Sequence, residues 1–64
     1  MTDIKELRAK FMSEYANLPV PERVQVVVLI DDEPYSWTSA HNEISNNTKL
    51  GIKILEKMKY VGIL

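Results

Sequence analysis

VQVVVLIDDEPYSW, residues 24–37, is the stretch that decides the fold. Its first seven residues are almost all β-branched or aliphatic and follow a proline-containing turn, so they predict a strand over residues 24–30. Side chains alternate along a strand, and the face predicted to meet the helices carries Val24, Val26, Val28 and Ile30. The opposite face carries Gln25, Val27 and Leu29. Two of these three side chains are apolar, so we expect this second face to need a cover as well.

Three acidic residues, Asp31, Asp32 and Glu33, follow the strand. Carboxylates at the end of a strand could bind Mg²⁺ or Ca²⁺. However, successive side chains of an extended chain diverge, and the ligand spacing and the glycine of a calcium loop are both missing. We therefore interpret Asp31 and Asp32 as a hairpin turn, with Pro34 at the start of a short return strand. A catalytic pair of carboxylates would need Glu43 as its second member.

The segment before the strand is predicted to be a helix. Asp3 can cap its N-terminus, and Glu6 follows at the spacing of a capping box. Apolar residues then recur at intervals of three and four, and they are Ile4, Leu7, Phe11, Tyr15 and Leu18. The prolines of NLPVPE, residues 17–22, end this helix.

The segment after the return strand is predicted to be helical too. Ser36 or Thr38 can cap a helix over residues 37–45, whose inner side carries Ala40 and Ile44. The sequence SNNT, residues 45–48, interrupts it, and Thr48 can cap a further helix whose apolar positions are Leu50, Ile54, Leu55, Met58 and Val61. Gly62 has the position of a C-terminal cap, after which Ile63 and Leu64 can fold back on the core. Residues 37–61 could also form one bent helix, because asparagine inside a helix is unfavourable but not prohibitive.

These elements predict an α+β fold in a single domain over residues 1–64, with an N-terminal helix, a two-stranded hairpin and two C-terminal helices or one bent helix. A chain of this size buries only about 60% of its unfolded surface. A two-stranded hairpin with an apolar second face and a long apolar edge is a liability in a monomer. We therefore expect a homodimer in which the strands of two copies pair or stack.

The composition excludes several classes of protein. The absence of cysteine removes disulfides, thiolate chemistry and cysteine-ligated zinc, and it points to the cytoplasm. The longest apolar run, residues 26–30, is too short to span a membrane. The net charge is −1, but residues 24–47 hold acids without lysine or arginine, whereas residues 48–64 hold four lysines and one glutamate. This division can guide two copies together or steer a charged partner.

No enzyme is predicted. His41 is the only histidine, and no suitable acid or nucleophile accompanies it, so we interpret it as a surface residue near a helix start. The only glycines are Gly51 and Gly62, so no glycine-rich phosphate loop exists, and neither a cofactor nor a metal is expected.

The aromatic pair Tyr35 and Trp37 would share one face of the return strand. Such a pair can stack on bases or anchor a protein interface, and core packing explains it equally well. We favour the core or a dimer interface, because a small chain needs all of its large side chains. The candidate protein interface is therefore Val27, Leu29, Tyr35 and Trp37.

The last predicted helix carries a lysine stripe, in which Lys49, Lys53 and Lys57 recur at steps of four and Lys59 lies nearby. A basic second helix after SNNT is compatible with a helix-turn-helix, and ILEKMKYVGIL, residues 54–64, resembles the end of a winged-helix recognition helix. The chain departs from the winged-helix pattern because the helix has no arginine and no three-helix core precedes the strand. Lysines are also favourable near a helix C-terminus without any ligand. The sequence thus favours a cytoplasmic, non-enzymatic interaction or regulatory module acting as a homodimer, and nucleic-acid binding through these lysines is the alternative.

Overall fold

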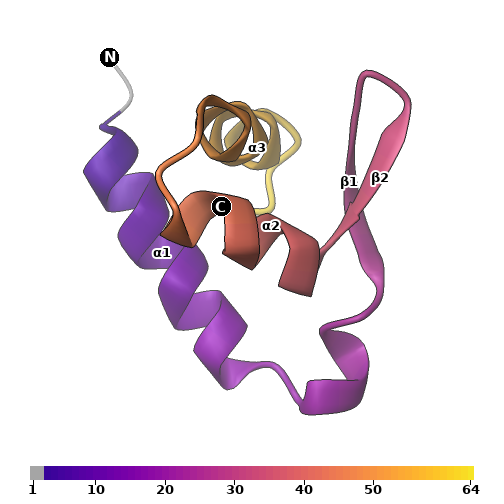
Figure 1. Ribbon diagram of the computed structural model, residues 1–64. Coiled ribbons are helices and arrows are strands. Elements are labelled where there is room, and N and C mark those ends of the chain that lie inside the picture. The colour runs from indigo at the N-terminus through magenta and orange to yellow at the C-terminus, as the bar shows by residue number, and fades with distance from the viewer. Residues whose placement is uncertain (1–2) are drawn as a thin grey trace.

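The computed structural model describes residues 3–64. Three helices, α1 (Ile4–Asn17), α2 (Trp37–Ser45) and α3 (Lys49–Tyr60), pack together beside a hairpin of β1 (Val26–Ile30) and β2 (Glu33–Ser36) (Figure 1). A single turn of 3₁₀ helix, η1 (Val20–Glu22), joins α1 to the hairpin. The predicted α+β class is confirmed, with three helices and a two-stranded antiparallel sheet.

Side-chain caps determine where the helices begin. Asp3 accepts a hydrogen bond from the backbone N–H of Lys5 at 2.9 Å, which starts α1. The Ser36 hydroxyl accepts from the N–H of Ser39 at 3.1 Å and starts α2, so Ser36 rather than Thr38 is the cap. Thr38 instead donates its hydroxyl to the carbonyl of Arg23 at 3.1 Å, and this ties the start of α2 to the segment before β1.

The C-terminal region forms two helices rather than one bent helix. Asn47 adopts a left-handed conformation with φ of 55°, which breaks the chain between α2 and α3. The Thr48 hydroxyl then accepts from the N–H of Gly51 at 2.9 Å and caps α3. At the far end Gly62 has φ of 88°, and the N–H of Ile63 donates to the carbonyl of Met58 at 2.8 Å. This is the six-to-one bond of a Schellman cap, so the prediction for Gly62 is confirmed.

Two of the acidic residues form the turn of the hairpin. Ile30 pairs with Glu33, and the two residues between them, Asp31 and Asp32, both have positive φ, at 50° and 67°. Two consecutive left-handed residues define a type I′ turn, whose twist matches that of the strands. The predicted turn is therefore confirmed.

The predicted faces of β1 are partly wrong. Val28 is buried and Ile30 half-buried as expected, but Val24 and Val26 are 72% and 60% exposed. The reason is a β-bulge: Val26 pairs with Ser36 and Val28 with Tyr35, so Val27 is an extra residue that breaks the alternation. The strand also begins at Val26 rather than Val24.

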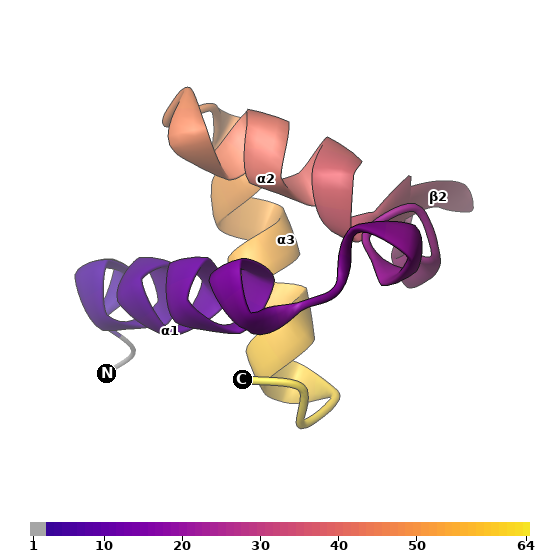
Figure 2. The same cartoon turned by 90° about the horizontal axis from the view of Figure 1, so that it is seen from below.

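The three helices cross one another beside the hairpin (Figures 1 and 2). The core is formed by side chains of these helices together with Val28 of β1. Among residues 3–64, eight side chains are buried in it: Leu7, Phe11, Val28, Ala40, Ile44, Ile54, Leu55 and Met58. They include the central positions of the predicted stripe of α1 and both inner residues predicted for α2. Val61, placed on the inner stripe of α3 by the sequence, is exposed because it lies just past the last residue of the helix. No helix within residues 3–64 is long and apolar enough to cross a membrane.

Candidate protein interface along β1 and α3

The outer edge of β1 is unpaired, since within residues 3–64 the sheet contains only β1 and β2. In a hairpin with a two-residue turn, the closing pair, here Ile30 and Glu33, is hydrogen-bonded. The next pair, Leu29 and Pro34, is then a non-hydrogen-bonded pair, whose backbone groups point away from the partner strand. The N–H and C=O of Leu29 are therefore directed outward at the free edge of β1.

The outer edge of β2 is much less suited to pairing. Pro34 lies at the corresponding outward position and has no N–H to donate. The strand is four residues long and passes directly into α2 at Trp37. Proline on an edge strand is a common protection against edge-to-edge association. Of the two edges, only that of β1 offers both a donor and an acceptor at the outward position next to the turn.

Two adjoining hollows lie between β1 and α3, and together we call them the β1–α3 groove. The larger, of about 520 Å³, is lined by the end of β1 and the turn, through Leu29, Ile30 and Asp31, and by Lys53, Glu56, Lys57 and Tyr60 of α3. The other, of about 410 Å³, is lined by residues 26–29 with Lys57 and Val61. Leu29 and Lys57 line both hollows, so the groove follows the whole of β1.

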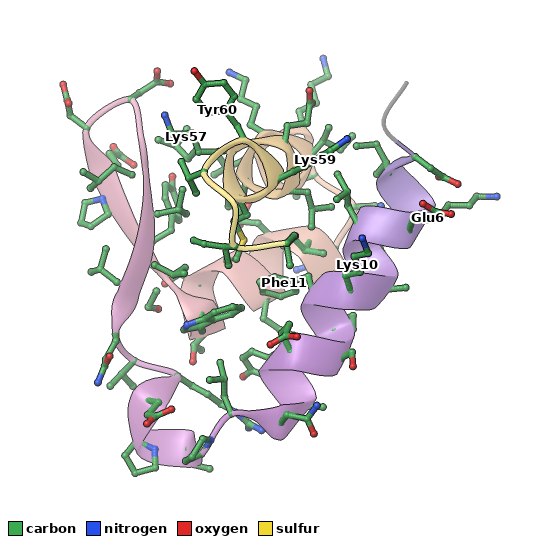
Figure 3. All side chains as sticks on the ribbon, turned by 180° about the vertical axis from the view of Figure 1, so that it is seen from behind. Glu6, Lys10, Phe11, Lys57, Lys59 and Tyr60 are labelled. Carbon is green, nitrogen blue, oxygen red and sulfur yellow. The ribbon has the colours of Figure 1, made fainter. Side chains whose placement is uncertain are left out.

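Apolar side chains are exposed around this groove. Leu29 is 56% exposed and Tyr60 is 87% exposed, and Val26 and Val61 are exposed as well. Figure 3 shows Lys57 and Tyr60 where α3 lies near the hairpin, whereas Lys59 is directed toward α1. A cluster of exposed aliphatic and aromatic side chains beside an unpaired strand edge is typical of a protein-binding surface.

The four residues of the predicted interface lie in different surroundings. Leu29 is exposed on the groove, but Val27 is half-buried and packs against the core. Trp37 is the first residue of α2, so the expectation that it shares a strand face with Tyr35 is wrong. Its ring stacks on Phe11 at a centroid distance of 5.5 Å and belongs mainly to the core. Tyr35 is half-buried at the core margin.

Sequence reasoning missed three residues of this surface: Val26, Tyr60 and Val61. The bulge that turns Val26 outward has no local sequence signal. Tyr60 lies off the apolar stripe of α3 and is exposed. Its position outside the stripe was the one signal in the sequence that could have predicted this exposure.

The tip of the hairpin is acidic. Asp31, Asp32 and Glu33 are all exposed there, and the Tyr35 hydroxyl donates to Oε2 of Glu33 at 3.2 Å. Desolvation by the surrounding protein, together with the hydrogen bond and charge of Glu33, raises the pKa of Tyr35 above its ordinary value of 10.0. By contrast, the four lysines of the sequence stripe are exposed on α3, and Lys53 and Lys57 line the groove.

The other candidate chemical groups have structural partners. Oε1 of Glu43 lies 2.9 Å from the Thr48 hydroxyl, at the junction of α2 and α3. His41 is half-buried rather than exposed, and its ring stacks on Tyr15 at 4.2 Å, while the Arg23 guanidinium lies 4.4 Å from the centre of the same Tyr15 ring. Throughout residues 3–64, no three histidine, cysteine or acidic side chains gather in a group that could hold a metal ion.

Comparison with protein-family models, with curated proteins and with solved structures gives no match for this chain. The β1–α3 groove is therefore the feature of the chain that bears on its function.

Proposed function

We propose that this protein is a non-enzymatic protein-interaction module that binds an extended strand along the free edge of β1 and acts as a homodimer in the cytoplasm. The observation that carries the proposal is the pairing of Leu29 with Pro34. This pair turns a backbone donor and acceptor of β1 outward, while proline removes the donor from the edge of β2.

Strand addition uses main-chain hydrogen bonds for affinity and neighbouring pockets for side-chain specificity. The β1–α3 groove supports both requirements, because Leu29 lines both of its hollows and exposed apolar side chains surround it. An exposed apolar edge of this kind is unfavourable in an isolated monomer.

A second copy is the occupant that the surface favours. The chain carries both an acidic hairpin tip and exposed lysines on α3, so one copy complements another. An interface of ordinary size covers about 800 Å² on each partner. This is a modest part of the 4411 Å² that the chain exposes, and the groove with its apolar rim is the natural centre of such an interface.

The test is the mass of the protein in solution. We expect sedimentation equilibrium at micromolar concentration to give twice the chain mass of 7.4 kDa. Leu29→Pro removes the outward N–H from both copies but leaves the hydrogen-bonded pairs of the hairpin intact. Losing two hydrogen bonds at about 1 kcal/mol each weakens a dimer by roughly thirtyfold.

Leu29→Thr is the matched control, because threonine shortens the apolar side chain but keeps the N–H and suits a strand. We expect it to weaken the dimer less than Leu29→Pro, and circular dichroism should show both variants folded. A monomer at micromolar concentration in the unmodified protein would contradict the proposal.

Nucleic-acid binding is the second candidate, since Lys49, Lys53 and Lys57 lie exposed along α3. Phosphate contacts release counterions, so such binding would weaken steeply with salt and would be lost in Lys53→Glu. The net charge of −1 makes this candidate the weaker one. The absence of a mobility shift at low salt would reject it.

A further inference from the structure

The two walls of the β1–α3 groove run in opposite directions. At one end, Asp31 of the turn and Lys53 line the same hollow. At the other end, Val26 lies beside Val61 in the second hollow. Lys57 lines both hollows. The acidic tip of a copy therefore lies at the Lys53 end of its own groove, and the end formed by Val26, Lys57 and Val61 has no acidic residue in its lining.

We propose that the β1 strands of two copies pair in antiparallel orientation across a two-fold axis, so that the acidic tip of each copy lies against Lys57 of the other. The inference rests on the proposed function, and it assigns the partner's orientation and the charged contact that determines it. Antiparallel pairing reverses the partner strand, which brings the partner's turn to the Val26 end of the groove. A two-fold axis makes this contact twice, once on each side.

The alternative, parallel pairing, is unfavourable on electrostatic grounds. It would bring together the two hairpin tips, each with three exposed acids, Asp31, Asp32 and Glu33. Like charges that face one another across strands destabilise the pairing. Antiparallel pairing separates the tips by the length of the strand and gives each of them a lysine instead. Charge thus selects between two orientations that the free edge alone would permit.

A charge exchange tests this arrangement. Lys57→Glu reverses the lysine, and the triple change Asp31→Asn, Asp32→Asn and Glu33→Lys makes the tip net positive, with asparagine, which tolerates the left-handed conformation, at both turn positions. Each variant alone replaces two attractions in the dimer by two repulsions, so we expect its self-association to weaken by about tenfold. In an equimolar mixture, the mixed dimer has a favourable pair on both sides. The dissociation constant of the mixed dimer should return to about that of the unmodified protein.

Lys49→Glu is the matched control. It makes the same change of charge on the same helix, but Lys49 does not line the groove. We expect its dissociation constant, measured by sedimentation at equal ionic strength, to remain within about twofold of that of the unmodified protein, because scattered surface charges contribute little.

The results separate the two proposals. Recovery in the mixture, without an effect of Lys49→Glu, supports the antiparallel arrangement. A protein that forms a dimer but shows no recovery in the mixture overturns the arrangement and leaves the proposed dimeric module in place. An equal loss in Lys49→Glu also overturns it, since net charge would then explain the effect. An unmodified protein that stays monomeric overturns the proposed function and this inference with it.

Discussion

Gly51 of α3 lies directly against the backbone of Glu43 in α2. A Cβ atom at position 51 would be 2.7 Å from the carbonyl oxygen of Glu43 and 3.0 Å from the Cα of Ile44. Backbone atoms cannot move aside as a flexible side chain can. The close approach of α2 and α3, which brings Ile44 and Ile54 into the core, therefore requires glycine at this position.

We predict that Gly51→Ala lowers the free energy of unfolding by about 1–3 kcal/mol, because the added methyl group forces the two helices apart. The sign is informative, since alanine in place of glycine inside a helix is otherwise stabilising by about 1 kcal/mol. Urea unfolding followed by circular dichroism measures the change. Lys49→Ala, at an exposed position of the same helix, should stay within about 0.5 kcal/mol. A stabilised Gly51→Ala variant would show that the helices are not in this close contact.

The hairpin turn gives a prediction of opposite sign. Asp32 has φ of 67°, where an L-residue is strained and glycine is not. Glycine is the preferred second residue of a type I′ turn. Asp32→Gly should therefore raise the free energy of unfolding by about 0.5–1 kcal/mol. Asp32→Ala, which keeps the Cβ and loses the polar side chain, should lower it. If both substitutions destabilise, the aspartate side chain itself is needed at the turn.

The junction of α2 and α3 depends on Thr48. Its hydroxyl accepts from the N–H of Gly51 at 2.9 Å and lies 2.9 Å from Oε1 of Glu43. Thr48→Ala removes both contacts and should cost about 1–2 kcal/mol of unfolding free energy, the range of a lost helix cap. Thr48→Ser keeps the hydroxyl and should cost much less. Equal losses in the two variants would assign the effect to the methyl group rather than to the cap.

Features that depend on residues close together in the chain could be predicted from the sequence. Asp3 and Thr48 were predicted as caps, the two aspartates as the turn and Gly62 as a C-terminal cap, because each acts on backbone groups within a few positions. The stripe of α1 followed from helical periodicity in the same way.

Features that depend on residues far apart in the chain were not predictable in this way. The bulge at Val27 arises from how β1 aligns with β2, and it reverses the side on which Val26 lies. The stacking of His41 on Tyr15 joins α2 to α1, which no local pattern indicates. The β1–α3 groove could not be predicted for the same reason, because Leu29 and Lys57 are far apart in the sequence and line the same hollows only in the folded chain.

Tyr35 gives a prediction about alkaline pH. Partial burial and the hydrogen bond to Glu33 raise its pKa above 10.0 in the folded protein, because both disfavour the tyrosinate. The unfolded chain therefore loses this proton first as the pH rises. The stability contributed by neutral Tyr35 is fully present below about pH 10 and is lost as the pH passes through the higher, folded pKa. We expect the free energy of unfolding to fall, as the pH rises through about 10 and above, by more in the unmodified protein than in Tyr35→Phe.

The tyrosinate absorbance of the folded protein measures the same effect directly. The difference between the unmodified protein and Tyr35→Phe isolates Tyr35 from the other two tyrosines, Tyr15 and Tyr60. Glu33→Gln should lower the pKa of Tyr35 toward 10.0, because it removes the charge beside the hydroxyl. Glu22→Gln, a matched change in η1 outside the hairpin, should leave this titration where it is. A titration of Tyr35 below its ordinary value would contradict the contact with Glu33, because only a neighbouring cation or a donor to the phenolate could produce it.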